Sequence, residues 1–558
     1  MNKRFVLALL LTGAVFILTP ILFPGSRRVP PPSASLNTLD TSGVQVVTPP
    51  QSPAGAAAAP AHATGNAPAQ VAAETTLVST GKARLRLSSI GGALIGAEFT
   101  DIRRLSADSS PVELAPRGEP LLRFRLVTGH DTIALDRTSL RRQPGTVPNE
   151  IAYHGDAQGV PVSVQWSFAP DTYRVKIKGG PEGVGYVSRV SVRATGIPAG
   201  GYLLTDLPTG FRSSESDTAG DFRHLAYAYK PENGGADLVR FGKPDPGERS
   251  IHRGPLLWAV AKTKYFLVGI LATDSASRFT ELEVDGVAKT SKIATRGQAT
   301  VLIPLRDGGA TVEVYVGPQE FRRMIAMGRA FESANPYGGW MQGIIQPFAT
   351  IVIRVLLWMK DQLHSYGLTL IIFGVAIRVV LWPLNQIAMR SGIKMQRIQP
   401  ELAEAQKKYA SKPEKQREEL MRIYREHGMS PFSALSGCLP MLIPMPVLFA
   451  LFFVFQNTIE FRGVSFWWMA DISQKDPFYI LPAVMAASMF LSSWIGQRNT
   501  PPNPQAKMMM YFLPVFMLAV LGNFAAGLNL YYAAQNLATI PQQWLIANER
   551  AKAIQRPS

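Results

Sequence analysis

The feature that most limits what this chain can fold into is the run YGLTLIIFGVAIRVVLWPLN at Tyr366–Asn385. About 20 mainly apolar residues suffice to cross a bilayer as a helix. Thr369 and Arg378 are the only polar side chains between Leu368 and Leu384. An arginine near the bilayer centre costs roughly 2.5–3.5 kcal/mol on insertion scales and usually faces water or a partner. We therefore expect Arg378 in a hydrated cavity inside the membrane, with snorkelling to the headgroups as the alternative.

The composition suits a membrane protein with a large soluble part. Of the 558 residues, 46% are hydrophobic and only 17% are charged, while the net charge is +17. Such a basic excess is found in nucleic-acid-binding proteins and also in the cytoplasmic loops of membrane proteins. We interpret it in the second way and expect no specific nucleic acid as a partner.

Motifs for covalent chemistry are absent from the sequence. The single cysteine, Cys438, excludes an intrachain disulfide, and the sequence has neither a GxxxxGK[ST] phosphate loop nor an HExxH pair. We therefore expect no enzyme activity, no cofactor and no metal.

The N-terminal region predicts an anchor followed by a tether. Residues 1–25 carry Lys3 and Arg4 before a long apolar run, and prolines and Arg27–Arg28 follow it instead of a small-residue cleavage site. This pattern favours an uncleaved transmembrane anchor over a signal peptide. Residues 26–76 are rich in Pro and Ala, lack apolar periodicity and predict a disordered linker.

From residue 77 to about 316 the sequence alternates apolar and polar residues, as in KARLRLSSI and GATVEVYV. This period of two predicts a large antiparallel β-sandwich, and with a short trailing helix the domain spans 77–333. The run LLWAVAKTKYFLVGILA at 256–272 is interrupted by two lysines, so it predicts a hairpin of two core strands and no membrane span. A structural or docking role is favoured over a sugar-binding or partner-binding pocket.

Residues 334–365 predict an amphipathic helix that lies in the membrane interface, although a span is the alternative. The charge pattern supports the interfacial placement. The stretch 390–425 carries ten Lys and Arg, which the positive-inside rule places in the cytoplasm. With a cytoplasmic N-terminus, that location requires the helix at 334–365 to lie flat.

Residues 390–427 predict a cytoplasmic helical hairpin. Ile398, Leu402 and Ala405 repeat at helical spacing, and Pro413 opens the second helix. A solvated hairpin explains its charged outer faces, but its place directly after the arginine-bearing span suggests capture of a substrate or a ribosome. The basic residues that would serve this role are Arg397, Lys407, Lys408, Arg417 and Arg422.

Four further apolar runs predict the remaining spans, at 435–455, 477–495, 508–522 and 528–546. With 366–385 they form a five-span core over 366–547, and with the anchor they make six spans. An even number of spans places both termini in the cytoplasm, including the short tail 548–558.

The core segments resemble the YidC membrane-protein insertase family in its Gram-negative form. The resemblance rests on GCLPMLIPMPVLFALFF (437–453), DPFYILPAVMAASMF (476–490), AGLNLYYAAQNLATIPQQWLI (526–546) and IRVVLWPLN (377–385). It implies a polytopic α-helical protein of the bacterial inner (plasma) membrane with a periplasmic β-supersandwich domain. It also implies a groove open to the cytoplasm and to the lipid, in which Arg378 and Tyr532 face the substrate.

The resemblance also indicates the other groove residues and the partners. Gly374 stands where relatives often carry threonine, and Gln535 and Asn536 are polar residues of the last span. The implied partners are nascent membrane proteins, the ribosome, the Sec translocon and the lipid bilayer. The expected function is insertion of nascent transmembrane segments, alone or with the translocon. A transporter or channel with an arginine-lined cavity and an envelope-assembly protein acting through its β domain are the alternatives.

Overall fold

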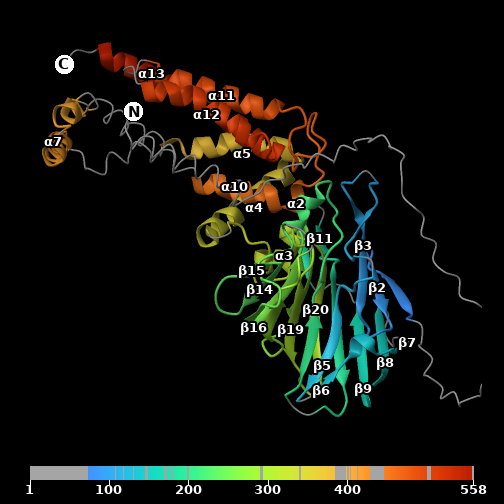
Figure 1. The fold of residues 1–558 in the computed structure, drawn as a ribbon. Helices are drawn as coiled ribbons and strands as arrows, with labels where there is room; N and C mark the ends of the chain where they lie inside the picture. Colours follow the sequence, from blue (N-terminus) through green and yellow to red (C-terminus); the bar gives the residue numbers. More distant parts are fainter. Residues whose placement is uncertain are drawn as a thin grey trace, which may run out of the picture.

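The computed structural model describes residues 73–383, 398–427, 445–498 and 504–555, apart from short gaps. The gaps are 107, 117, 130, 145–148, 169–172, 178–179, 198–199, 290–292, 339–340, 399–400, 403 and 411. The predicted anchor, nearly all of the linker, Arg397 and the first residues of the span at 435–455 lie outside the described part. A β domain is followed by a helical domain that lies at one end of it (Figure 1).

The β domain consists of 20 strands among the described residues, and all their pairings are antiparallel. The first ten are β1 (Thr75–Ser79), β2 (Ala83–Ser88), β3 (Leu94–Arg103), β4 (Pro111–Glu113), β5 (Arg123–Thr128), β6 (Asp131–Ile133), β7 (Arg141–Pro144), β8 (Glu150–Ala157), β9 (Val160–Ser167) and β10 (Arg174–Ile177). The others are β11 (Gly180–Gly183), β12 (Val187–Ala194), β13 (Tyr202–Asp206), β14 (Ala226–Pro231), β15 (Asp237–Arg240), β16 (Arg249–Lys262), β17 (Phe266–Ala272), β18 (Phe279–Asp285), β19 (Gln298–Pro304) and β20 (Gly309–Pro318).

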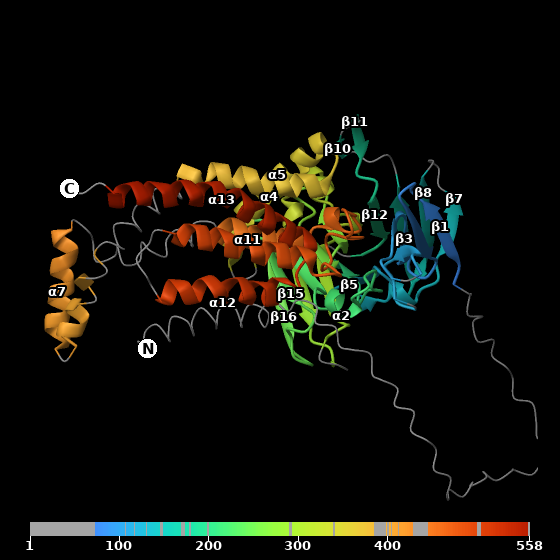
Figure 2. The ribbon, with the colours of Figure 1, turned by 90° about the horizontal axis from the view of Figure 1, so that it is seen from above.

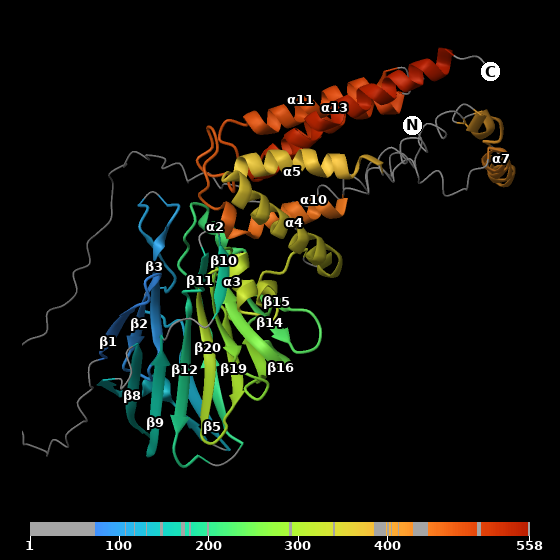
Figure 3. The ribbon, with the colours of Figure 1, turned by 180° about the vertical axis from the view of Figure 1, so that it is seen from behind.

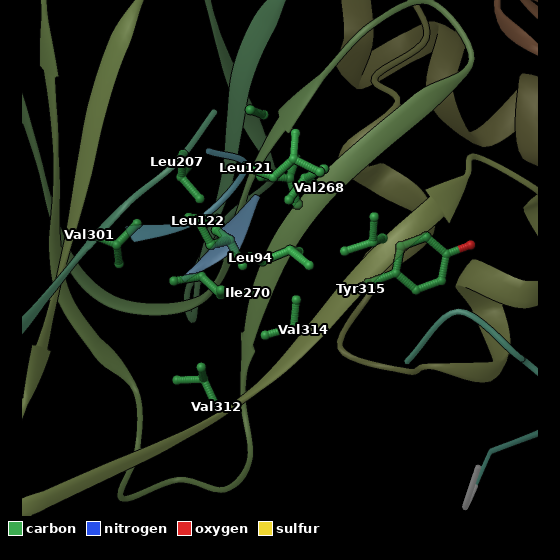
Figure 4. Packing of buried hydrophobic residues seen from close by; sticks show 14 of the residues in the cluster. Leu94, Leu121, Leu122, Leu207, Val268, Ile270, Val301, Val312, Val314 and Tyr315 are labelled. Atoms are coloured by element: carbon green, nitrogen blue, oxygen red, sulfur yellow. The ribbon is translucent and has the colours of Figure 1, made fainter. Parts of the chain in front are cut away.

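The strands form sheets of 14, four and two strands. In the largest sheet the order is β6-β5-β13-β19-β18-β16-β17-β20-β12-β9-β8-β7, and β14 joins β16 to β15. Buried side chains from this sheet and from the four-stranded sheet β1–β4 belong to one hydrophobic core, part of which is seen in Figure 4. The alternating pattern buries one face of a strand, as in β2, whereas β17 is buried along its whole length. A β-sandwich-type domain is therefore present as predicted.

The hairpin prediction for 256–272 is confirmed. β16 and β17 pair antiparallel with Lys262 opposite Leu267, so the connection turns at Thr263–Tyr265. Thr263 Oγ1 accepts a hydrogen bond from Phe266 N at 3.1 Å, which closes the turn. The apolar residues of this run pack in the sheet, because a pleated strand buries them without a membrane.

Helices make up the second domain. They are α4 (Gln342–Leu363), α5 (Tyr366–Val380), α7 (Pro413–Glu426), α10 (Met445–Asn457), α11 (Ile480–Gln497), α12 (Pro504–Leu521) and α13 (Ala526–Gln555). Shorter helices are α2 (Thr218–Phe222), α3 (Phe321–Ala326), η1 (Leu135–Arg137), η2 (Phe331–Ala334) and η4 (Ile459–Phe461). In the described part, α4 and α11 are long and apolar enough to cross a membrane, and α5 and parts of α10 and α12 are shorter apolar helices.

The long helices of this domain pack side by side. α12 contacts α11, α11 contacts α13, α13 contacts α5, and α4 contacts both α5 and α10. Figure 2 shows α5, α13, α11 and α12 side by side from above. The helix α7 lies apart from them, at the end of the helical domain opposite to the β domain (Figure 3). Ile398, Leu402 and Ala405 pack there against Ile423 of α7, so the apolar side of the predicted hairpin is buried on itself.

The two domains are joined by a buried ion pair. Arg462, which follows η4 in the α10–α11 loop, donates from Nε to Glu215 Oε1 at 2.7 Å, and the two side chains are 5% and 4% exposed. Its Nη1 donates to Arg103 O at 3.0 Å and its Nη2 to Ser214 O at 3.1 Å. Glu460 adds a second link, because its Oε1 accepts a hydrogen bond from Phe321 N of α3 at 2.8 Å. The β domain is thus fixed on the end of the helical domain.

Candidate functional site

The arginine-bearing run folds into α5, which begins at a capped N-terminus. Ser365 accepts a hydrogen bond from Leu368 N at 3.4 Å, which satisfies one of the free amides of the first turn. Arg378 lies in the last turn, where a positive charge is favourable to the helix dipole. The helix thereby presents Arg378 at the end that is remote from the β domain (Figure 1).

Gly374 allows α5 to approach the last helix, α13, closely. A Cβ atom at this position would meet the carbonyl oxygen of Tyr531 at 3.0 Å and the Cβ of Ala534 at 3.4 Å. The preceding residue, Phe373, packs on the ring of Tyr531, with centroids 5.9 Å apart. The absence of a side chain at Gly374 therefore permits the close contact between these two helices.

Arg378 makes one hydrogen bond in the described part of the chain. Its Nη2 donates to Gln542 Oε1 of α13 at 2.6 Å, and the Gln542 side chain is fully buried. Arg378 Nε and Gln542 Nε2 are buried and have no partner among the described residues. A buried donor without an acceptor lowers stability by about 1–3 kcal/mol. An acceptor oxygen bound to these two donors would recover that free energy.

The two tyrosines of α13 occupy different environments. Tyr531 is 2% exposed and packs toward α5, whereas Tyr532 is half-buried against the hydrophobic cluster of the helical domain. Their rings are 5.5 Å apart in an edge-to-face arrangement. The structure therefore places Tyr531 directly on α5, and the assignment of Tyr532 to a substrate groove stays a prediction.

The side chain of Asn536 is turned toward α11, and Gln535 takes part in a hydrogen bond through its main-chain oxygen. Asn536 Nδ2 donates to Met485 O of α11 at 3.4 Å, and Gln535 O accepts from Thr539 Oγ1 at 2.8 Å within α13. Among the described contacts, neither side chain is hydrogen-bonded to Arg378. The polar groups of α13 thus divide between the α5 side and the α11 side.

The basic residues of the predicted hairpin lie on the surface. Lys407, Lys408, Arg417 and Arg422 are exposed, and Arg422 pairs with Glu419 and Glu426 on the same helix. For the other three, the described part of the chain provides no ion pair. Exposed basic side chains, interspersed with exposed glutamates such as Glu414 and Glu418, therefore lie beyond the end of α5 that carries Arg378 (Figure 3).

Gln542 is the site residue that sequence reasoning missed. Its signal was the pair Gln542–Gln543 inside the apolar segment that ends the last predicted span. Within the described residues there is also no group of three or more His, Cys, Asp or Glu that could hold a metal ion.

Comparisons with known proteins agree with this arrangement of two domains. A family model described as the YidC periplasmic domain matches residues 75–351, and one described as the 60Kd inner membrane protein matches 358–553. A membrane protein insertase YidC of Pelodictyon phaeoclathratiforme is 30% identical over 75% of this chain and 72% of its own length. Another, from Anaeromyxobacter dehalogenans, is 34% identical over 57% of this chain, which spans only about half (55%) of that relative. The crystal structure of YidC from Thermotoga maritima is 13% identical, covers 84% of this chain and 99% of its own, and has a TM-score of 0.28.

Proposed function

The chain belongs to the YidC family of membrane protein insertases, and from this membership we propose that it inserts nascent transmembrane segments into the inner membrane. The relatives are named membrane protein insertase YidC, and one of the two matching family models is described as an inner membrane protein. The single observation that carries the proposal to this chain's own residues is the hydrogen bond between the partly buried Arg378 and the fully buried Gln542, which joins the packed helices α5 and α13.

In the proposed mechanism, Arg378 lowers the barrier for the polar end of an incoming segment. A charged or polar group that leaves water loses its hydration, and a fixed cation with free donors replaces part of it. The apolar part of the segment then leaves sideways into lipid, which contributes about 0.8 kcal/mol per buried CH₂. The membrane potential assists an outward-moving acidic group by about 2.3 kcal/mol per 100 mV, so no nucleotide is needed.

The proposed topology follows from the charge pattern and from the positions of the two ends. The β domain would face the periplasm, six spans would place both termini in the cytoplasm, and α4 would lie in the interface. Exposed apolar side chains of α4, such as Ile351 and Trp358, support contact with lipid. A cysteine at Ala470 should be labelled from outside and one at Lys412 should not, in a chain whose Cys438 is replaced by serine; the reverse pattern would refute this topology.

The ribosome and the Sec translocon are proposed partners. The exposed Lys407, Lys408 and Arg417 of the hairpin offer cations to acidic surfaces such as ribosomal RNA. Because the hairpin lies beyond the end of α5 that carries Arg378, a chain leaving a ribosome bound there would arrive near that arginine. The groove, the hairpin and the spans at 366–385, 435–455, 477–495, 508–522 and 528–546 together form the proposed insertase core.

The decisive experiment compares substrates in insertion assays with the purified chain in proteoliposomes. Arg378→Ala is expected to lower insertion of a segment with acidic translocated residues by about tenfold, the effect of about 1.4 kcal/mol. Arg378→Lys should retain much of the activity because a cation remains, and a neutral segment should be less affected by either change. Equal loss for lysine and alanine, together with falling protein abundance, would instead indicate an arginine held for its planar fork.

A further inference from the structure

The side chain that accepts a hydrogen bond from the Arg378 guanidinium, Gln542, is uncharged. The guanidinium has five N–H donors and no acceptor, so Gln542 must present its oxygen to it and turn its own NH₂ group away. A carboxylate at this position would form an ion pair and cancel the charge. Glutamine fixes the direction of the guanidinium and leaves the positive charge available.

The position of Gln542 on α13 supports this role. It lies 11 residues after Tyr531, which is close to three helical turns, so both side chains lie on the face of α13 that packs on α5. The next residue, Gln543, points elsewhere: its Oε1 lies 2.7 Å from where a Cβ on Gly496 of α11 would be. The two adjacent glutamines therefore serve different helix contacts.

We infer that Gln542 is a positioning residue for substrate recognition: it orients Arg378 so that Arg378 Nε–H and its own Nε2–H₂ receive acceptor oxygens of a passing segment. This inference rests on the proposed insertase function and deepens it. The supporting observation is that both donors are buried and lack a partner within the described chain. The acceptors that fit are carboxylates and main-chain carbonyls, which a partly unfolded segment supplies.

The alternative is that Gln542 only stabilises the packing of α5 on α13. The two roles differ in how substitutions combine. If Gln542 acts through Arg378, its substitution loses its effect once Arg378 is removed, whereas a packing role makes the two effects add.

The test uses the full chain in proteoliposomes and a single-span reporter whose short translocated segment carries either two Asp or two Asn. Gln542→Met keeps the length and volume of the side chain but removes the acceptor, and Gln542→Glu keeps the acceptor but neutralises the charge. Gln542→Met is combined with wild-type Arg378 and with Arg378→Ala, whereas Gln542→Glu is made only with wild-type Arg378, because without the arginine its carboxylate would be buried without a cation. Gln543→Met is the matched control, and protein abundance and melting temperature are measured for every variant.

Gln542→Met is expected to lower insertion of the Asp reporter by about threefold to tenfold, the range for the net contribution of one ordinary hydrogen bond. Gln542→Glu should lower it at least as much, and the Asn reporter should change less than twofold in both. In the Arg378→Ala background Gln542→Met should not lower insertion further, and Gln543→Met should behave as wild type in either background.

Additive losses in the Arg378→Ala background, or equal losses for both reporters with reduced abundance, would overturn the positioning role. Wild-type insertion by both Gln542 variants would overturn it as well and leave the insertase proposal intact. If the wild-type chain inserts neither reporter, the insertase proposal itself fails.

Discussion

The buried side chain of Arg462 and the partly buried side chain of Arg378 bind very different partners. Arg462 binds Glu215 and two carbonyl oxygens, and it lies 5.9 Å and 5.8 Å from the ring centroids of Tyr265 and Phe266. Arg378 binds the single amide of Gln542 and leaves its Nε without a partner among the described residues. Arg462 joins the helical domain to the β domain, whereas Arg378 joins the helices α5 and α13.

The difference shows how hydrogen-bond satisfaction separates structure from function. A buried arginine whose three nitrogens all donate to protein groups is held in one place and has little left to offer a ligand. An arginine with a neutral partner and a buried N–H that lacks an acceptor lowers the stability of the protein without ligand. Binding an acceptor oxygen to that N–H recovers the lost free energy. Arg462 is therefore interpreted as a structural clamp, and Arg378 as a binding group.

Removal of the clamp is expected to have the largest effect on stability. Arg462→Ala leaves the carboxylate of Glu215 buried without its cation, which typically costs about 3–5 kcal/mol. The melting temperature of the purified chain in detergent should fall, and limited proteolysis should cut more readily between the β domain and the helical domain. The double variant Arg462→Met, Glu215→Leu removes both charges and should recover part of the loss. A melting temperature unchanged by Arg462→Ala would remove the contrast with Arg378.

The second prediction concerns pH at the same domain junction. Burial, with a smaller contribution from Glu320, raises the pKa of Glu460 from 4.5 to about 7. The folded protein therefore holds the proton more tightly than the unfolded chain, so this stabilisation is complete below pH 4.5 and is lost as the pH rises to 7. The rise corresponds to about 3 kcal/mol at 1.36 kcal/mol per pKa unit.

Glu460→Gln keeps the oxygen that accepts from Phe321 N and cannot ionise. The variant should therefore be more stable than the wild type at pH 8 and should lose most of the change in melting temperature between pH 6 and 8. Burial also raises the pKa of Asp221, to about 6, so its contribution falls mainly below this window. An unchanged slope between pH 6 and 8 in the variant would exclude Glu460 as its source.

The smallest expected effect on stability is that of Arg378→Ala, although its effect on insertion is large. The change removes the buried unpaired Nε–H of Arg378 but leaves the buried Gln542 Oε1 without its donor, so the two effects partly offset and the net change should be about 1 kcal/mol. Melting temperature in detergent measures it beside Arg462→Ala under the same conditions. A destabilisation as large as that of Arg462→Ala would make Arg378 a second clamp and contradict the comparison.

The sequence by itself determined the features that depend on neighbouring residues. The alternation of apolar and polar residues after residue 77 was enough to predict a β domain, because a half-buried strand repeats every two residues. The lysines of Lys262–Lys264 were enough to predict the turn between β16 and β17, and Pro413 marked the first residue of α7. The apolar run around Arg378 marked the helix that carries the candidate site.

Only the tertiary structure decided which distant groups meet. Arg378 and Gln542 are 164 residues apart, and Arg462 and Glu215 are 247 apart, so no local pattern relates them. The choice of Tyr531 over its neighbour Tyr532 as the residue facing α5 depends on the rotation of α13, which Gly374 and the packing of the helices set. Periodicity fixes which face of an element is apolar, whereas the partner of that face, and of each polar group on it, is chosen by packing over the whole chain.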